Sequence, residues 1–409
     1  MIGKECGDGS GIRIPDGVAL RGAEHTHIFI SSHHGLCGTN NDFSDLVLVR
    51  STPFGPLLEL QDGVATLTSV SLLNYDQEEV PGYVAQPGLI LTGTAKAKWT
   101  AGTPSTSLGR SPLSELRDRA VLEIHGGRAE LPPLPRTETI FRVTDGSTLE
   151  LNGVELIAPS APLENTTLHG VQIQGGTGDP QLLISNSTFV GLSSGIGARS
   201  NSRISVSDSR FEGMLGPAIM TFAQSSQYHS SLDVKSCQFV NNESGIITFG
   251  NLDVSIDTST FLGGTLGLEL ITAQNLRLTN CELRKNDIAL FTGARTTFLR
   301  SNVIVDNVST GAYFTSPAQT VDLGTASDPG RNVLASNGVA AAEPGTNLWL
   351  RSTAVDCSVS AVGNLWSPNE QGADSRGSYA TGSTQPLEPT TGDGANYRID
   401  ASCRLLLAP

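Results

Sequence analysis

One eight-residue pattern of apolar and polar positions recurs along the middle of the chain. Apolar residues occupy its first and third positions, a polar residue its fifth, a small residue its sixth, and usually phenylalanine or leucine its last. The copies are LLISNSTF, ISVSDSRF, LDVKSCQF, VSIDTSTF, LRLTNCEL and the degenerate TFLRSNVI, which end at Phe189, Phe211, Phe239, Phe261, Leu283 and Ile304. Successive ends lie 22, 28, 22, 22 and 21 residues apart. A nearly constant period of this length predicts a repeat fold.

The pattern predicts a specific backbone conformation. Side chains two residues apart point to one face of a strand, so the first and third positions enter a core. Asn and Asp tolerate left-handed backbone angles, and Ser and Thr can hydrogen-bond to their own backbone. Such residues fill the fifth position: Asn186, Asp208, Ser236, Thr258, Asn280 and Ser301. We therefore predict two short strands joined by a sharp bend, with coils stacked about 4.8 Å apart and the phenylalanines in a ladder.

These coils predict an all-β fold, a single-stranded right-handed parallel β-helix. Weaker copies of the pattern end at Leu72, Leu156 and Ile173. A βαβ fold would need amphipathic helices of about 10–15 residues between the strands, whereas the intervals hold segments such as GLSSGIGARSNS.

The domain organisation follows from where the repeat is regular. We expect residues 1–45 to form an N-terminal coil and cap, 46–366 the β-helix, and 367–409 a C-terminal cap or tail. Residues 112–124 have helical character, and we interpret about 92–140 as an insertion on the flank of the β-helix.

Composition and net charge limit the kinds of molecule that the protein could bind. The chain has 45 glycines, 5% aromatic residues and 16% charged residues, which suits a turn-rich repeat domain that lengthens coil by coil. The net charge of −14 argues against nucleic-acid and anionic-membrane partners, because both require a basic face. No apolar run approaches the roughly 18 residues of a membrane span. We expect a monomer without membrane insertion.

Four cysteines lie near the ends of the repeat. Cys6 and Cys37 flank the first coils, and Cys357 and Cys403 flank the last. We predict that they form disulfides that staple the ends, as in exported proteins. The N-terminus lacks the apolar segment of a secretory signal, and GIRIPDGVALRG already resembles a strand and a turn. We therefore expect an export signal upstream of this numbering.

Two further cysteines behave differently. Cys237 and Cys281 share the small sixth position, two coils apart. Stacking places them roughly 9–10 Å from each other, which is too far for a disulfide. We expect buried free thiols.

The sequence resembles the right-handed parallel β-helix, or pectate-lyase-like, superfamily over about residues 10–366. The segments VDLGTASDPGRNVL and SAVGNLWSPNEQGADSRGSY are similar to the closing segment of bacterial secreted and cell-surface β-helix proteins. This resemblance implies export and a surface role, and it implies no activity. The motifs of the polygalacturonase-like and pectin-methylesterase-like enzymes are absent. The alginate-epimerase-like Asp-Pro-His-Asp motif is also absent, because Asp328 and Pro329 lack the following His-Asp. Pectate-lyase-like sites, with a calcium-binding acidic cluster beside an arginine base, have weak signatures and stay open.

The first candidate site follows from ladder geometry. Asp233, Lys235, Asp257, Arg277 and Glu282 occupy outward positions on three successive coils. Lys235 and Asp257 share the fourth position and should lie about 5 Å apart at the backbone. β-Elimination of a uronate needs a base and a group that neutralises the carboxylate, which these residue types supply. The alternative is a solvated ladder of ion pairs.

The second candidate is a metal site near the N-terminus. His25 and His27 are two residues apart on a predicted strand, so both imidazoles share a face, and His33 or His34 could supply a third ligand. Three histidines are a common zinc ligand set. The alternative is a polar first coil with ordinary titrating histidines.

The third candidate is a glycan-binding loop. Tyr75, Asp76, Glu78 and Tyr83 lie within residues 74–86, and Trp99 follows. Aromatic rings stack on sugars and carboxylates bind hydroxyls or calcium, so we expect these side chains to line a glycan groove. The alternative is an exposed connecting loop.

Two functional hypotheses follow from these observations. The first is an extracellular or cell-surface β-helix that serves as a rigid interaction module, facing a polysaccharide or another cell-surface component. The second is a carbohydrate-active enzyme. We favour a polysaccharide lyase acting on an acidic, uronate-containing polysaccharide, with a glycoside hydrolase as the alternative. Calcium is the one cofactor that either hypothesis suggests.

Overall fold

A computed structural model of the chain describes residues 12–13, 18–30, 36–50, 56–74, 87–100, 105–107, 112–130, 139–158, 168–175, 178–199, 201–223, 230–315, 320–338, 346–350, 357–366, 397–399 and 403–406. These residues contain 42 β-strands and no helix. They divide into an N-terminal unit, residues 1–205, and a C-terminal unit, residues 206–409.

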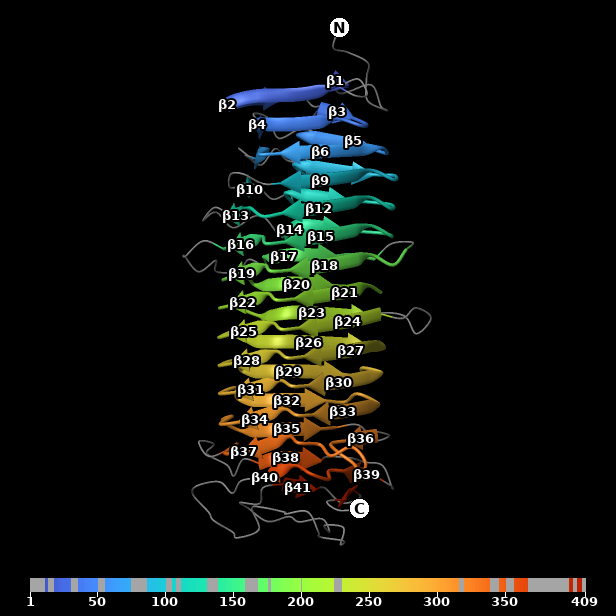
Figure 1. Cartoon of the computed structure of the whole chain (residues 1–409), viewed down its shortest axis with the longest axis vertical. Coiled ribbons are helices and arrows are strands. Elements are labelled where there is room, and N and C mark those ends of the chain that lie inside the picture. The colour runs from blue at the N-terminus through green and yellow to red at the C-terminus, as the bar shows by residue number, and fades with distance from the viewer. Residues whose placement is uncertain are drawn as a thin grey trace, which may run out of the picture. The chain divides into compact units, whose positions relative to one another are not determined.

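The strands of each unit are parallel and form two sheets, which we name sheet A and sheet B (Figure 1). In the N-terminal unit, sheet A contains β1 Ile12–Arg13, β3 Leu36–Gly38, β5 Leu58–Gln61, β8 Leu89–Thr92, β11 Ser114–Leu116, β14 Thr139–Val143, β17 His169–Ile173 and β20 Ser194–Ala198. Sheet B contains β2 Ala19–Ile30, β4 Asp42–Arg50, β6 Val64–Thr68, β7 Ser71–Asn74, β9 Lys96–Thr100, β10 Ser105–Ser107, β12 Val121–His125, β13 Arg128–Glu130, β15 Thr148–Asn152, β16 Glu155–Ile157, β18 Gln181–Ser185 and β19 Thr188–Val190. Strand β21, Arg203–Ser207, spans the boundary between the units.

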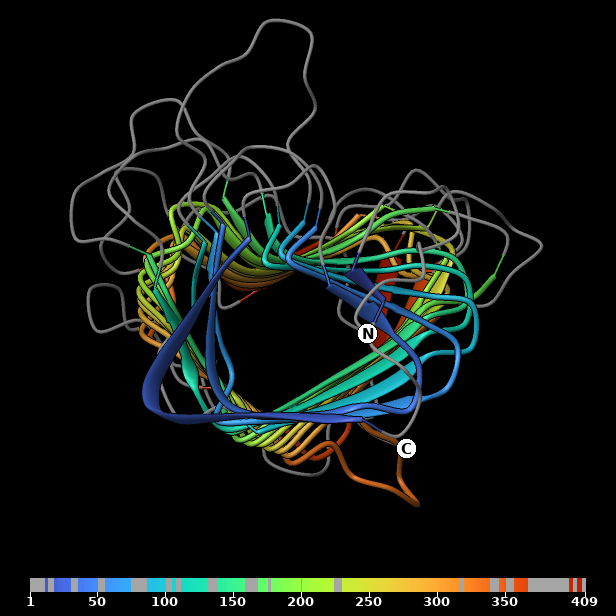
Figure 2. The same ribbon diagram turned by 90° about the horizontal axis from the view of Figure 1, so that it is seen from above.

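The C-terminal unit repeats this arrangement. Its sheet A contains β23 Pro217–Ala223, β26 Ser244–Gly250, β29 Leu266–Ile271, β32 Ile288–Thr292, β35 Thr310–Phe314, β38 Thr346–Leu350 and β41 Tyr397–Ile399. Its sheet B contains β22 Arg210–Glu212, β24 Ser230–Lys235, β25 Gln238–Val240, β27 Leu252–Asp257, β28 Thr260–Leu262, β30 Asn275–Thr279, β31 Glu282–Arg284, β33 Thr296–Arg300, β34 Val303–Val305, β36 Thr320–Asp322, β37 Val333–Ala335, β39 Cys357–Ser360, β40 Leu365–Trp366 and β42 Cys403–Leu406. A regular coil contributes one strand to sheet A and two short strands to sheet B. The coils of each unit follow a closed outline around a core of buried apolar side chains (Figure 2).

The bend between the two sheet B strands has the predicted conformation. All six residues of the fifth repeat position have left-handed backbone angles, with φ between 49° and 58°. Asn and Asp adopt this conformation more readily than most residues other than glycine. The bend prediction is confirmed, and with it the parallel β-helix.

The core contains the predicted aromatic ladder. Phe211, Phe239 and Phe261 are register partners on β22, β25 and β28. Their ring centroids lie 5.1 and 4.5 Å apart, and each adjacent pair of rings is within 3° of parallel. All three rings are buried. Residues about 22 positions apart therefore lie directly above one another in this unit, as predicted.

The predicted insertion at about 92–140 is wrong for the residues that the structure describes there. Strand β12 pairs in register with β9 on one side and β15 on the other, as in any other coil. The segment 112–124, predicted to be helical, forms β11 and β12. Leu122 and Ile124 are both buried, with Glu123 between them pointing outward. This alternation has the period of a strand rather than that of a helix.

One weak copy of the repeat was assigned to the wrong part of the coil. The segment ending at Ile173 forms β17 in sheet A, whereas Leu156 and Phe189 are register partners in sheet B. Both sheets alternate apolar and other residues, so the alternation alone does not distinguish them.

The two central cysteines are free and buried, as predicted. Ser259 lies between them: it donates its backbone N–H to Cys281 Sγ and accepts the Cys237 N–H at its Oγ, 3.1 Å away. Burial raises the pKa of the Cys237 thiol to about 11 and that of Cys281 to about 12. Both groups are therefore neutral and unreactive at ordinary pH.

The terminal predictions lie mostly outside the described residues. The structure does not describe Cys6, the side chains of Cys357 and Cys403, or residues 367–396 of the predicted cap. The backbones of Cys357 and Cys403 are register partners on β39 and β42. The two disulfides stay predictions.

Candidate functional site

The predicted lyase residues lie on the outer face of sheet B in the C-terminal unit. Lys235 and Asp257 are register partners on β24 and β27, which confirms the predicted neighbours. Asp233 and Arg277 share a different row on β24 and β30, and Ser255 separates them. Glu282 lies on β31, beyond the bend.

Hydrogen bonds occupy the Asp257 carboxylate. The Thr279 hydroxyl and the Asn280 amide donate to Oδ1 at 2.7 and 2.9 Å, and the Thr258 hydroxyl donates to Oδ2 at 3.0 Å. These bonds, those from Thr279 and Asn280 first, lower the pKa of Asp257, and the nearby Lys235 lowers it further. A carboxylate held in this state is a weak base.

The remaining predicted catalytic residues differ in their surroundings. Burial, and secondarily the charge of Asp253, raise the pKa of Asp233. The Arg277 guanidinium lies 4.5 Å from the Phe298 ring centroid. Glu282 pairs with Arg284 at 2.7 Å. The arrangement is a lattice of ion pairs and hydrogen bonds on a sheet face, and the catalytic role of these residues stays a prediction.

Trp99 was assigned to a glycan groove, and this assignment is wrong. Its side chain is 2% exposed, and its indole N–H donates to the Val70 carbonyl at 2.9 Å inside the core. It follows Ala97 on the inward side of β9, where alternation places every second residue. The associated loop residues Tyr75, Asp76, Glu78 and Tyr83 lie outside the described residues.

The predicted histidine site also lies largely beyond what the structure describes. The backbones of His25 and His27 belong to β2, with a register irregularity between Arg21 and Thr26. Their side chains and His33 are not among the described residues. Elsewhere in the described ranges, no three His, Cys, Asp or Glu side chains are close enough to hold a metal ion.

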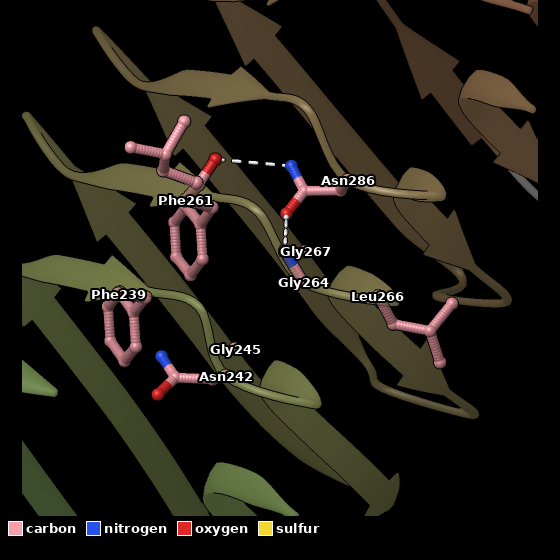
Figure 3. Close-up of a pocket in the computed structure, with 9 residues that line it drawn as sticks. Phe239, Asn242, Gly245, Phe261, Gly264, Leu266, Gly267 and Asn286 are labelled. Carbon is pink, nitrogen blue, oxygen red and sulfur yellow. Dashed lines mark hydrogen bonds between the residues drawn. The ribbon is translucent and has the colours of Figure 1, made fainter. Parts of the chain in front are cut away.

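The described pocket at the corner of three coils in the C-terminal unit is a packing feature. It is lined mainly by Phe239, Phe261 and glycines, and it has no space for a water-sized molecule. Figure 3 shows Asn286 crossing between coils there: its amide donates to the Phe261 carbonyl and its oxygen accepts the Gly264 N–H, both at 3.1 Å. This pocket therefore does not offer a ligand site.

A row of polar residues that sequence reasoning missed lies on the outer face of sheet A in the N-terminal unit. The register aligns Glu115, Arg142, Gln172 and Gly197 on β11, β14, β17 and β20. A second row lies two residues further along the chain, directly after the last residue of each strand. It contains Arg117, Thr144, Gln174 and Arg199, whose backbone N–H groups each donate to the preceding coil. We call these eight residues the arginine face.

Glu115 organises two of the arginines on this face. Its carboxylate accepts from Arg117 Nε at 2.6 Å and from Arg142 Nη1 at 3.3 Å. Glu115 is 6% exposed, whereas Arg117 and Arg199 are exposed. Arg142 Nε is buried and has no hydrogen-bond partner among the described residues. Two guanidinium groups thus share the Glu115 carboxylate, and Arg199 adds a third positive charge further along this face.

Two further acidic residues border the arginine face at its turn. Asp118 accepts the Gly93 N–H at 2.9 Å, and Asp145 accepts the Asp118 N–H at 3.4 Å and the Thr144 hydroxyl at 3.1 Å. Both have left-handed backbone angles. Both carboxylates accept backbone N–H groups of the turns of a neighbouring coil.

The arginine face corresponds to a recurring triplet in the sequence. Glu-Leu-Arg at 115–117, Arg-Val-Thr at 142–144, Gln-Ile-Gln at 172–174 and Gly-Ala-Arg at 197–199 are one triplet, with an apolar residue at its centre. Their spacings of 27, 30 and 25 residues are less regular than those of the sheet B pattern, because loops of different length enter each coil before sheet A.

The protein comparisons bear on the fold. Residues 169–324 match the family model described as right handed beta helix region. This part of the chain is a right-handed parallel β-helix. No curated protein sequence matches the chain.

Two solved structures are similar to the chain at low identity. One is a mannuronic acid specific polysaccharide family 6 lyase enzyme from human gut microbiota, with 11% identity, 86% of this chain and 80% of that chain covered, and a TM-score of 0.34. The other is a mutant of the periplasmic alginate epimerase AlgG, with 10% identity, 97% and 84% covered, and a TM-score of 0.36.

No helix in the described part of the chain is long and apolar enough to cross a bilayer.

Proposed function

We propose that the protein is a rigid β-helical interaction module that binds an acidic polysaccharide across the arginine face, outside the cytoplasm. One observation carries the proposal: Arg117, Arg142 and Arg199 lie in two adjacent rows of one outer sheet face, on a chain whose net charge is −14. Guanidinium groups bind carboxylates and sulfates through paired hydrogen bonds. A local excess of arginine on an acidic protein therefore selects an anionic ligand.

The rigidity of the face favours a repeating ligand. Each coil contributes one outward residue per row, so the polar side chains of a row are spaced by the inter-strand distance of about 4.8 Å. Gln172 and Gln174 lie between the arginines, joined by a hydrogen bond of 2.9 Å from the Gln174 amide to the Gln172 oxygen. Amides in this position can bind sugar hydroxyls without adding charge.

The double variant Arg117→Ala/Arg199→Ala tests the proposal. Both side chains are exposed, so their removal should spare the fold while it removes two of the three cations. We expect binding to alginate or polygalacturonate at low salt to weaken by about tenfold or more, since each lost charge-assisted contact is worth roughly 1 kcal/mol or more. Affinity electrophoresis with polyuronate in the gel measures this directly.

Arg203→Ala is the matched control. Arg203 is an exposed arginine on β21 in sheet B, 3.9 Å from Asp179, and its removal should leave binding unchanged. A neutral glucan should not retard the wild-type protein. Equal losses for the control and the double variant, or no retardation by any polyanion, would contradict the proposal.

A uronate lyase is the second candidate function, and one observation favours it. His169 is buried at the start of β17, and its Nδ1 lies 3.1 Å from where a Cβ on Gly197 would be, within the arginine face. Arginine can neutralise a uronate carboxylate and histidine can act as a base. The same polysaccharides, incubated with the protein and followed by the absorbance of unsaturated ends, distinguish the two functions, because a pure binding module produces no such absorbance.

A further inference from the structure

Over six strands of sheet A in the C-terminal unit, one outward row is apolar or aromatic except at one position. The strands β23, β26, β29, β32, β35 and β38 lie one above the other in Figure 1. Their register aligns the outward residues Met220, Ile247, Glu269, Phe291, Tyr313 and Trp349. Among these six residues, Glu269 is the single charged one. We call the row the Glu269 stripe.

Aromatic rings dominate the stripe and the row beside it. Tyr313 and Trp349 stack with centroids 4.5 Å apart, and Phe291 meets Tyr313 edge-on at 5.0 Å. One row further along the strands, Phe222 and Phe249 stack at 4.7 Å. Stacking along the coils covers ring faces and leaves ring edges outward, which does not suit stacking of a sugar ring on those faces.

The Glu269 carboxyl has no partner among the described residues. Its register neighbours are Ile247 and Phe291, and Ile271 lies next along its own face. Neither β26 nor β32 carries a charged residue. No described residue gives Glu269 a hydrogen bond or an ion pair, and burial alone raises its pKa.

Two other outward carboxylates of this unit are paired with arginines. Glu212 pairs with Arg210 at 2.9 Å, and Asp322 pairs with Arg300 at the same distance. A half-buried carboxylate without such a partner costs free energy in the folded state. Glu269 is a half-buried carboxylate for which the described residues supply no such partner.

We propose that Glu269 and the aromatic side chains next to it bind an organic cation, an ammonium or guanidinium group carried on an apolar stem. The cation would pair with the carboxylate, and the stem would cover apolar ring edges and the Ile247 and Ile271 side chains. This site is on a different unit from the arginine face, and the proposal does not depend on the function proposed there.

The chemistry excludes other ligand classes at this stripe. Anions are repelled by Glu269. Calcium and magnesium need several oxygen ligands, and the neighbouring side chains Ile247, Phe249 and Phe291 supply none. The cation has two plausible sources, a lysine or arginine side chain of a polypeptide partner or a free polyamine, and both present the same group.

Calorimetric titration of the full-length protein with n-butylammonium tests the site, with n-butanol and butyrate as matched probes. We expect n-butylammonium to bind and the other two not to bind. Glu269→Gln should weaken the binding by about tenfold or more, which corresponds to roughly 1.4 kcal/mol. Glu243→Gln, at an exposed glutamate of the same unit, should bind like the wild type.

Equal binding of n-butylammonium by Glu269→Gln and wild type would overturn the proposal, as would equal binding of n-butanol. Absence of n-butylammonium binding to wild type would do the same. Titration with putrescine and with a blocked Leu-Lys-Leu peptide then separates the two sources: tighter binding of the peptide indicates a polypeptide partner, and tighter binding of putrescine a polyamine. The melting temperature of Glu269→Gln establishes that the variant is folded.

The effect of Glu269→Gln on stability should depend on pH. Because the folded-state pKa of Glu269 is raised above 4.5, the folded state loses relative stability as the pH rises through that value and above it. At about pH 4 the acid is largely protonated in both states, so Glu269→Gln and wild type should melt together. At about pH 7.5 the variant should melt at a higher temperature. A stabilisation that is equal at both pH values would show that the charge is not its cause.

Discussion

Phe239→Ala should destabilise the protein by about 4 kcal/mol, the largest effect of any single substitution that we predict. Removal of a buried phenylalanine ring costs roughly 3–5 kcal/mol through lost burial and the cavity left behind. Phe239 is the middle ring of a stack and contacts Phe211 on one side and Phe261 on the other. Both of these rings therefore lose a partner, at about 0.5–1.5 kcal/mol for each aromatic pair. Urea denaturation measures the difference in unfolding free energy.

Phe222→Ala provides the comparison within the same unit. Phe222 also stacks on a phenylalanine of the next coil, at 4.7 Å, but it lies on the outer face and is half-buried. Its removal opens no internal cavity, so we expect a loss well below that of Phe239→Ala. Phe239→Leu, which keeps an apolar side chain in the core, should be intermediate. If Phe222→Ala and Phe239→Ala cost the same, the ladder does not carry the stability assigned to it.

Asn307→Ala should cost about 3 kcal/mol through buried polar groups rather than through packing. Asn307 Oδ1 accepts the backbone and side-chain N–H groups of Asn286 at 2.9 and 3.1 Å. Its amide donates to Asn337 Oδ1 at 2.7 Å and to the carbonyls of Leu283 and Val305. Alanine leaves several of these groups buried without a partner, at roughly 1–3 kcal/mol for each one.

The measurement for Asn307→Ala is again urea denaturation, with Asn275→Ala as the matched control. The Asn275 amide donates to Asp253 at 2.7 Å, but this pair is exposed to solvent. Water replaces the lost bond there, so the change should stay within about 0.5 kcal/mol. A cost for Asn307→Ala as small as that of the control would mean that water reaches the interior position.

Asn307 belongs to a ladder that the sequence analysis did not anticipate. Asn286, Asn307, Asn337 and Asn347 are linked amide to amide, and a second ladder joins Asn302, Asn332 and Asn364. Asn302 stands at the sixth position of the last copy of the repeat, and Asn286 and Asn307 follow the sixth positions of the last two copies by five residues. The pattern alone did not distinguish a surface turn from a buried stack, because Asn is common in both.

The candidate sites were harder to predict than the coils. Lys235 and Asp257 were correctly placed as neighbours because both lie in the regular sheet B repeat. The arginine face was missed because it lies on sheet A, where the spacing between coils varies. Trp99 was misplaced because aromatic residues suit both a core and a glycan surface, and only its position on the inward side of β9 decides between them.

By itself, the sequence determined the coil: which positions enter the core, where the chain bends, and which residues about 22 apart stack. These follow from strand alternation and from backbone angles at single residues, which are local properties. Only the tertiary structure decided which outward residues meet and which charges find partners. Those outcomes depend on register between coils whose loops differ in length, and a one-residue change in register would replace every neighbour on a face.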